Sequence, residues 1–405
     1  MPSSPKLTYN RVMTKIVSVV LPTYNEKDNL DKFVSLLLDQ EKALPGWRME
    51  IVIADSDSPD GTGELAKKLA AKNSQIHYLK VGPGLGVGLI EGHRYAIKNI
   101  KPDILAQMDA DGQVEVDVIQ RLIKGIEEGY DFVQGSRFVK GGENKLSFSR
   151  RFFSAGMSWA SRIIMGPFDL KEFANSARAF TPELFKKINF DRMPWQEKTF
   201  VIQPSFTNEA IMAGARYKEV PLIFKNRAEG YSKNKVVNYT YDVITYSIAA
   251  RLYKLGFKFD FFRFSHKLKT LLKFSIVGFS GTFVDFVIYK LLINMVHLAP
   301  ANAKMFSTEF GIINNFLLNN FWTFKYRKTT TNVYQRFGIY NFVSVGGLVI
   351  AVLTIQLLHS VYGDGSVVLL NKRIALNTLY FFATIPPAMA WNFTVNHFVT
   401  WRNKG

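Results

Sequence analysis

The stretch that organises this chain is Gln107-Met108-Asp109-Ala110-Asp111-Gly112-Gln113, directly after the apolar run 104–106. The apolar run predicts the end of a buried strand. In extended backbone, residues two apart point to the same side, so Asp109 and Asp111 can reach one cation. Gln113 adds a third oxygen, and such ligands suit Mg²⁺ or Mn²⁺, which would neutralise a diphosphate leaving group. An acidic pair in a turn also fits a solvated loop, so the neighbouring segments decide between the two.

Strands and helices alternate over the first half of the chain. Apolar runs at 16–21, 50–54, 78–81 and 104–108 predict buried strands, and segments with helical spacing separate them. This order predicts a parallel sheet with helices on both faces, in which ligands bind beyond the carboxyl ends of the strands. The polar segments 22–26, 55–60, 82–88 and 109–113 follow those ends. We therefore expect them to converge on one crevice.

Glycines are frequent at 82–88, which suggests a dinucleotide-binding loop. The segment follows the third strand rather than the first, and the acidic residue expected after the next strand is missing. We therefore reject the dinucleotide interpretation. A turn that starts a helix and a phosphate contact remain about equally compatible with the pattern.

Composition limits the function classes. The 405 residues suffice for two domains, and 51 Lys and Arg against 33 Asp and Glu give a net charge of +18. This excess suits nucleic acid or an anionic membrane surface. The absence of cysteine excludes disulfides, thiolate metal sites and a cysteine nucleophile. Residues 1–15 lack a signal-peptide pattern, so we expect the first half to stay cytoplasmic unless a later helix translocates it.

Several motifs together resemble the family 2 glycosyltransferases of the α/β, Rossmann-like GT-A fold. The resemblance covers roughly residues 16–235 and is closest to the polyprenol-phosphate sugar synthases. The motifs that carry it are Val19-Val20-Leu21-Pro22-Thr23-Tyr24-Asn25-Glu26, Asp55-Ser56-Asp57-Ser58-Pro59-Asp60-Gly61-Thr62, Met108-Asp109-Ala110-Asp111-Gly112-Gln113, Gly135-Ser136-Arg137 and Arg227-Ala228-Glu229-Gly230-Tyr231-Ser232-Lys233.

The resemblance implies a role for each matching residue. Donor binding is implied for Pro22, Tyr24, Glu26, Ala54, Asp55, Ser56, Asp109, Ala110, Asp111, Arg227 and Lys233. The metal, Mg²⁺ or Mn²⁺, would be held by Asp109, Asp111 and Gln113. The acceptor phosphate would contact Arg137, Arg150 and Ser154, although Arg150 also fits an ordinary solvated basic face. The catalytic residues would be Asp111, Arg137 and Arg227.

The acceptor implied by the resemblance is polyprenyl (dolichyl) phosphate. Its monoester is largely dianionic near pH 7, so the reaction needs no side-chain base. We expect one in-line displacement with inversion at the anomeric carbon, which gives a polyprenyl-phosphate monosaccharide. The expected donor is GDP-mannose, with UDP-glucose or another UDP-sugar as the alternative. The segment 172–177 reads Glu172-Phe173-Ala174-Asn175-Ser176-Ala177 where the family usually has D-P-x-S-G-F, which leaves the sugar open.

The second half is predicted to lie in a membrane. Aromatic and basic residues alternate from 236 into the first apolar run, as in amphipathic helices at a membrane surface. Four apolar segments follow near 271–293, 303–324, 338–360 and 374–398, each close to the roughly 20 residues that a bilayer requires. Basic clusters lie before the first span, between the second and third, and after the fourth, which predicts a cytoplasmic catalytic domain and C-terminus. Lys372 and Arg373 on the far side do not fit this rule.

The membrane half also contains an internal repeat. Asn315-x-x-x-Asn319-x-x-x-Thr323 ends the second span, and Asn392-x-x-x-Asn396-x-x-x-Thr400 ends the fourth. Two similar helical hairpins are implied, as in other membrane folds built from repeats. This half resembles the GtrA-like four-helix domains. Hydrogen bonds between helices explain the asparagines more simply than contact with a lipid phosphate.

We therefore expect three parts: a catalytic domain at 1–235, interfacial helices at 236–270 and a four-helix transmembrane domain at 271–405. The expected partners are a nucleotide-sugar donor, a polyprenyl phosphate and the membrane. Nucleic acid is not expected, because it would leave the four spans unexplained. The competing interpretation is a transport protein that binds or flips a glycolipid and uses the front domain only for binding.

Overall fold

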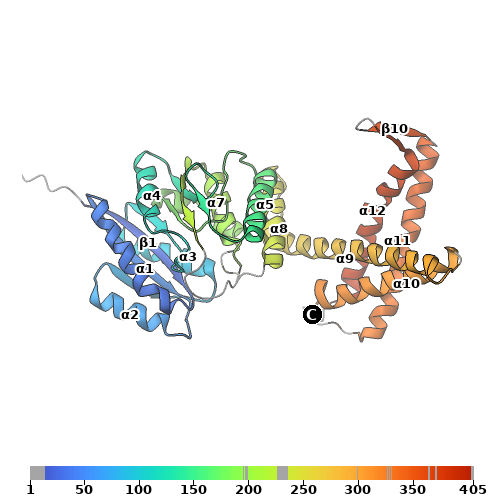
Figure 1. Cartoon of the computed structure of the whole chain (residues 1–405), viewed down its shortest axis with the longest axis horizontal. Helices are drawn as coiled ribbons and strands as arrows, with labels where there is room; N and C mark the ends of the chain where they lie inside the picture. The colour runs from blue at the N-terminus through green and yellow to red at the C-terminus, as the bar shows by residue number, and fades with distance from the viewer. Residues whose placement is uncertain are drawn as a thin grey trace, which may run out of the picture. The chain divides into compact units, whose positions relative to one another are not determined.

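A computed structural model of the chain describes residues 14–194, 196, 199–225, 236–298, 300–325, 327, 329, 331–363, 365–369 and 372–402. The chain forms two compact units, Met1–Ser265 and His266–Gly405. Figure 1 labels the elements of both. The predicted domain limits at 235 and 270 stay predictions, and the residues between 236 and 265 belong to the first unit.

The first unit contains a seven-stranded sheet with the order β3-β2-β1-β4-β7-β5-β8. Its neighbours pair in parallel except β7, which is antiparallel to both β4 and β5. The strands are β1 (Lys15–Thr23), β2 (Trp47–Asp55), β3 (Ile76–Lys80), β4 (Ile104–Gln107), β5 (Phe132–Ser136), β7 (Arg178–Phe180) and β8 (Tyr217–Pro221). The expected α/β class is confirmed, and the antiparallel β7 departs from the predicted parallel order.

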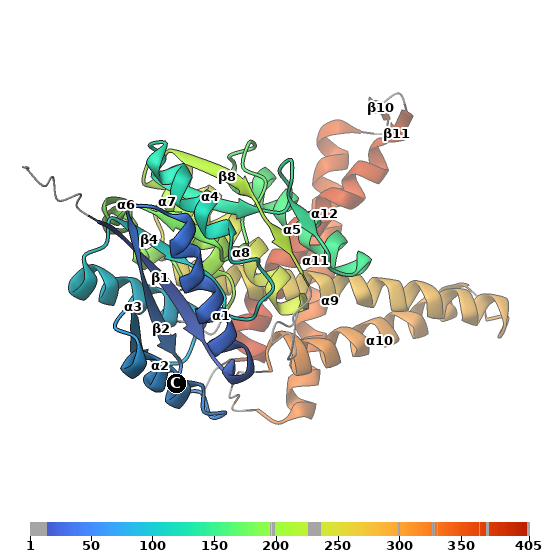
Figure 2. The same ribbon diagram turned by 60° about the vertical axis from the view of Figure 1, so that its left-hand side comes forward.

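Helices cover both faces of the sheet (Figures 1 and 2). Successive residues of β1 point to opposite faces, so Val19 joins one hydrophobic core and Val20 the other. The first core includes α1 (Lys27–Asp39), α2 (Thr62–Lys72) and α4 (Val118–Glu127); the second includes α3 (Leu85–Tyr95), α6 (Pro182–Lys187) and α7 (Ile202–Met212). Short elements complete this part: η1 (Gln40–Ala43), η2 (Ala96–Ile100), η3 (Phe190–Arg192) and the pair β6 (Glu143–Asn144) and β9 (Ile223–Phe224).

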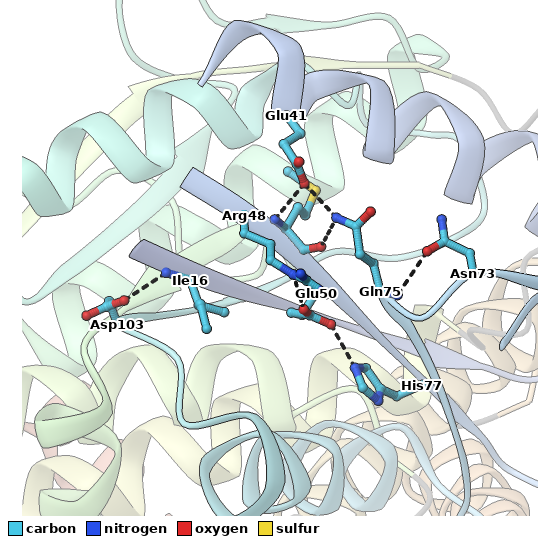
Figure 3. Close-up of polar contacts among 9 residues, drawn as sticks. Ile16, Glu41, Arg48, Glu50, Asn73, Gln75, His77 and Asp103 are labelled. Carbon is cyan, nitrogen blue, oxygen red and sulfur yellow. Dashed lines mark hydrogen bonds and ion pairs between the residues drawn. The ribbon is translucent and has the colours of Figure 1, made fainter. Parts of the chain in front are cut away.

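Polar side chains join neighbouring strands near their amino ends (Figure 3). The Glu50 carboxylate in β2 accepts from Arg48 Nε at 2.6 Å and lies 2.8 Å from His77 Nε2 on β3. Before β4, the Asp103 carboxylate accepts from the Ile16 amide at 2.7 Å. His77 thus has a packing role at the edge opposite the predicted crevice.

Two further helices form a third layer on the first unit. Helices α5 (Phe148–Met165) and α8 (Val236–Lys254) share one hydrophobic cluster with residues from the segment before α7. Tyr246 of α8 is buried and accepts a hydrogen bond from the Asn208 amide at 3.2 Å. Helix α8 is therefore packed into the catalytic unit over much of its length.

The second unit is mainly helical. Its long elements are α9 (Phe261–Asn294, which starts in the first unit), α10 (Pro300–Leu318), α11 (Val333–Tyr362) and α12 (Leu376–Val395). Among the described residues, Phe264–Leu292 and Val333–Tyr362 are long and apolar enough to cross a membrane, by length and composition. A hairpin of β10 (Ser366–Leu369) and β11 (Lys372–Ala375) joins the last two helices. The four-span topology stays a prediction.

The two predicted repeats end in the same local structure. Each continues into a π-helical turn, η4 (Asn319–Thr323) after α10 and η5 (Asn396–Thr400) after α12. The residues that follow these turns, Phe324 and Trp401, stack with ring centroids 4.6 Å apart. Arg327, in the connection after η4, donates hydrogen bonds to the backbone carbonyls of His397 at 2.5 Å and Trp401 at 2.8 Å. The first hairpin thus supplies a cap to the last helix.

Candidate active site

A cavity of about 360 Å³ opens at the carboxyl ends of the central strands. All four polar segments predicted to converge contribute to it, and so does a fifth segment before α7. Its lining residues are Pro22, Thr23, Tyr24, Glu26, Ser56, Pro83, Gly84, Leu85, Asp109, Ala110, Asp111, Thr199 and Phe200. The prediction from strand order is thus realised at one edge of the sheet.

Hydrogen bonds join the loop after β1 to the loop after β2. The amides of Asn25, Glu26 and Lys27 donate to Ser58 Oγ at 3.0 Å, Thr62 Oγ1 at 3.0 Å and Asp60 Oδ2 at 3.2 Å. Burial disfavours ionisation of the Asp60 carboxyl, but hydrogen bonds from Thr62 and Lys27 outweigh it and lower its pKa. These hydrogen bonds hold the two loops together, and the loops present Tyr24 and Glu26 to the cavity.

Asp55 has a different place from its neighbour Ser56. Its buried carboxylate accepts from Thr23 Oγ1 at 3.0 Å and from the Ser58 hydroxyl at 2.6 Å and amide at 3.0 Å. Ser56 lines the cavity, whereas Ala54 and Asp55 lie outside the lining found for the described residues. Asp55 therefore shapes the loop that carries Ser56.

The two carboxylates of the stretch 107–113 both line the cavity. Asp111 is buried, and its Oδ1 accepts from the Gln113 amide at 3.1 Å. Gln113 donates its side-chain amide to the Lys225 carbonyl at 3.1 Å and lies outside the lining. Within the described residues, no three His, Asp or Glu side chains gather at a point. Two carboxylates with space beside them fit a hard cation that completes its ligands with water and phosphate.

The glycine-rich segment 82–88 lines the cavity and also lets α3 approach the sheet. Gly84, at φ +124°, is part of the lining. A Cβ at Gly88 would lie 3.2 Å from Pro22 Cβ, and one at Gly92 would lie 2.5 Å from Val20 Cγ1. These glycines are therefore needed for close packing of α3 on β1, whatever the loop binds.

Arg137 is held by an ion pair that the sequence did not indicate. Its Nε and Nη2 each donate to a Glu172 carboxylate oxygen at 2.7 Å, and both side chains are almost fully buried. Burial disfavours the charge on Arg137, but the Glu172 carboxylate outweighs it and raises its pKa. Glu172 is the first residue of the segment 172–177, so this segment supplies the partner of Arg137.

Arg137 and the other predicted phosphate-binding residues lie apart from the cavity lining or outside the described residues. Ser154 lies on α5 and is partly exposed. Arg150 is on the same helix, and its side chain lies outside the described part of the structure. Arg227 and Lys233 also lie outside the described residues. The roles of all five stay predictions.

Sequence reasoning missed a buried polar layer beneath the cavity. Gln107 lies at its centre, with its Oε1 3.2 Å from His93 Nε2 on α3 and its Nε2 3.4 Å from Gln203 Oε1 on α7. Arg178 of β7 donates to the same Gln203 oxygen at 2.7 Å. The one signal in the sequence was the polar Gln107 at the end of an otherwise apolar strand.

His93 makes the stability of this layer depend on pH. Burial, opposed by the Gln107 contact, lowers the pKa of His93 to about 3 from the usual 6.5, so the folded protein keeps the imidazole neutral. Its contribution to stability is complete above pH 6.5 and is lost as the pH falls toward 3. Acidification from pH 7 to 5 should therefore lower the free energy of unfolding by about 2 kcal/mol through this residue.

The measurement is denaturant unfolding of wild type and His93→Gln at pH 5, 6 and 7. We expect the variant to be less stable at pH 7 but to lose less stability on acidification. Equal pH dependence in the two proteins would contradict the assignment.

Comparisons with known proteins agree with this geometry. The glycosyl transferase family 2 model matches residues 18–189, and the GtrA/DPMS transmembrane domain model matches residues 273–401. The chain is 32% identical over 314 residues to the dolichol-phosphate mannosyltransferase of Pyrococcus furiosus, covering 76% of this chain and 81% of that protein.

Two further relatives match about half of the chain. They are the undecaprenyl-phosphate mannosyltransferase of Micrococcus luteus, at 32% identity over 54% of this chain and 86% of that protein, and the polyprenol monophosphomannose synthase of Mycolicibacterium smegmatis, at 31% over 54% and 81%. The resemblance drawn from the motifs is confirmed. The chain therefore belongs to glycosyl transferase family 2 and is a membrane glycosyltransferase with a GtrA/DPMS transmembrane domain.

Proposed function

We propose that this enzyme transfers one mannose from GDP-mannose to the phosphate of a polyprenyl phosphate and so forms a polyprenyl-phosphate mannose. The observation that carries the proposal is the cavity in which Asp109 and Asp111 meet the segments that end β1 and β2. The three relatives named above, each named for mannose and a polyprenol or dolichol phosphate, support the choice of sugar and acceptor.

The donor diphosphate would lie beside the two acidic residues. Asp109 and Asp111 would hold a Mg²⁺ or Mn²⁺ ion, whose chemistry is to neutralise the diphosphate as it leaves. Tyr24, Glu26 and Ser56 would contact the nucleoside from the joined loops. Arg227 and Lys233 are proposed to reach the donor phosphates from the segment after β9.

The acceptor supplies its own nucleophile. A phosphate monoester carries close to two negative charges near pH 7, so an acceptor oxygen can attack the anomeric carbon directly and invert it. The chain then needs positive groups that offset the repulsion between two anionic reactants. Arg137, held in place by Glu172, together with Arg150 and Ser154, is proposed to fill that role.

The surface of α5 supports a lipid acceptor. Phe148, Phe152 and Trp159 share one face of this helix and are 76%, 69% and 60% exposed. Aromatic side chains exposed along one helix face are unusual in water but are stable at a membrane surface. This face would hold the polyprenyl chain, with Ser154 on the same helix near its phosphate.

Exchange of Phe148 and Phe152 to Ser should raise the KM for polyprenyl phosphate about tenfold, because the apolar area that contacts the lipid is lost. The KM for GDP-mannose should stay unchanged. Leu36→Ser, on helix α1 with a side chain that is also exposed, is the control. An unchanged KM for the lipid in the double variant would refute this role of α5.

The reaction is tested with the purified full chain in detergent, Mn²⁺ and polyprenyl phosphate. GDP-mannose, UDP-glucose and UDP-galactose are compared by nucleoside diphosphate release and by the lipid product formed. We expect release of GDP with GDP-mannose and one sugar per lipid. Release of UDP would identify the alternative donor, and release of neither would favour a protein that only binds or moves the glycolipid.

The catalytic unit and the C-terminus are proposed to lie on the cytoplasmic side. Basic residues at 267–273, 325–336 and 402–404 support this orientation. Because the chain has no cysteine, single cysteines placed in each connection can be labelled with a membrane-impermeant maleimide. Labelling of the 363–371 connection from the cytoplasmic side would overturn the topology.

A further inference from the structure

Arg178 is fully buried in β7, the antiparallel strand beneath the cavity. It pairs in register with Gln107 of β4 on one side and Gln134 of β5 on the other. Phe180, two residues on, joins the core with α3 and α7, so Arg178 points toward the same helices. The three polar side chains form a row across the sheet two residues before Asp109.

The direct partners of this guanidinium are neutral. Nη1 donates to the Gln203 carbonyl at 3.2 Å, and Nη2 donates to Gln203 Oε1 at 2.7 Å and to the Asn175 carbonyl. The rings of Phe132 and Phe206 lie 5.8 and 5.3 Å from its centre. Among the ion pairs of the described residues, none involves Arg178. A buried charge without a contacting counter-ion is costly, and such groups concentrate at functional sites.

The charges that act on Arg178 belong to the active site. Burial lowers its pKa to about 9, and attraction to Asp109 and Glu172 opposes this effect. Glu172 already forms two hydrogen bonds with Arg137. Asp109 is therefore the cavity carboxylate whose negative charge attracts the Arg178 guanidinium.

Gln203 connects Arg178 to the segment before α7, which forms one wall of the cavity. It is the second residue of α7, and the segment just before this helix carries the lining residues Thr199 and Phe200. Three of the described contacts of Gln203 are with Arg178 or Gln107. The start of α7 is thus tied to the end of β4, which precedes Asp109, and to the start of β7, which follows Glu172.

We propose that Arg178 is a positioning residue that couples binding of the metal to binding of the donor. Its charge beneath Asp109 weakens capture of a divalent cation by the empty cavity and strengthens binding of the anionic diphosphate, so cation and donor bind together. Its hydrogen bonds fix the wall that carries Thr199 and Phe200. This inference rests on the proposed function, in which Asp109 faces a cation and a diphosphate.

The charge effect predicts changes of opposite sign. In Arg178→Met, Mn²⁺ alone should bind about tenfold more tightly, because a repelling charge near Asp109 is removed. GDP in the presence of saturating Mn²⁺ should bind about tenfold more weakly. A merely structural role would weaken both, so the opposite signs separate the two explanations.

Two further variants keep the test decisive if Arg178→Met does not fold. Gln203→Glu places a carboxylate against the guanidinium and neutralises it in place. Like Arg178→Met, it should tighten Mn²⁺ binding and weaken GDP binding. Arg178→Lys keeps the positive charge but loses the two donor nitrogens of the planar guanidinium, so Mn²⁺ affinity should stay near wild type. Gln134→Met, in the same buried row but uncharged in wild type, is the control and should leave both affinities unchanged.

Mn²⁺ binding is measured with the full chain in detergent from the paramagnetic resonance signal of the free ion, and GDP binding by calorimetry. Opposite shifts in Arg178→Met and Gln203→Glu support the proposal. Weaker or unchanged Mn²⁺ binding in both variants overturns it. Failure of the wild type to bind Mn²⁺ or GDP would instead refute the proposed function on which the inference rests.

Discussion

Asp111→Asn should lower the rate of mannose transfer about a thousandfold, which corresponds to roughly 4 kcal/mol of lost transition-state stabilisation. The exchange removes one of the two aspartates, Asp109 and Asp111, that line the cavity two positions apart in the sequence. It keeps the shape of the side chain, and the new amide oxygen can still accept from the Gln113 amide. The loop should therefore keep its conformation while the negative charge is lost.

The measurement is release of nucleoside diphosphate at saturating donor and lipid, together with Mn²⁺ affinity. Glu115→Gln is the matched control, because this carboxylate lies four residues on, pairs with Lys225 at 2.5 Å and is not part of the cavity lining. It should retain close to full activity. Normal turnover by Asp111→Asn would remove the basis for the proposed metal site.

Glu172→Gln should destabilise the first unit by about 3–5 kcal/mol, because it leaves the nearly buried Arg137 charge without its partner. Glu172 is completely buried and accepts two hydrogen bonds of 2.7 Å from that guanidinium. Arg178 lies within the field of the same carboxylate, which increases the excess positive charge. Transfer should also fall, because Arg137 loses its fixed orientation.

Thermal unfolding of the full chain, followed by a probe in the first unit, measures the loss. The double variant Arg137→Met/Glu172→Gln should recover part of it, because the buried Arg137 charge that lost its partner is removed as well. Glu64→Gln breaks an ion pair on the surface of α2 and should leave the unfolding midpoint unchanged. Equal stability of Glu172→Gln and wild type would show that the pair contributes nothing.

Much of the sheet could be predicted because its strands are apolar runs buried on both faces. The strand ends then fixed where the segments with Tyr24, Ser56, Gly84 and Asp109 meet, since parallel strands deliver their carboxyl ends to one edge. Strand β7 was missed because it has three residues and begins with an arginine. Arginine is rarely buried, so a linear pattern places it on the surface.

The partners of the site residues could not be predicted for a related reason. Glu172 meets Arg137 across 35 positions, and Gln203 meets Arg178 across 25, through loops whose paths no periodicity describes. Thr199 and Phe200 reach the cavity from the segment before α7, whose first turn is held by that contact. The motifs therefore identified several of the residues that line the cavity, while the side chains that hold those residues in place became evident only in the folded structure.

The cap on the last helix of the second unit bears on the order of synthesis. Arg327 emerges from the ribosome some seventy positions before the carbonyls of His397 and Trp401 that it binds. The Arg327 guanidinium can form these hydrogen bonds only after the final turn has been translated. Closure of the helical bundle is therefore the last step in the folding of this unit. Chains that stall shortly before residue 396 should therefore be left with an open bundle that quality-control proteases can attack.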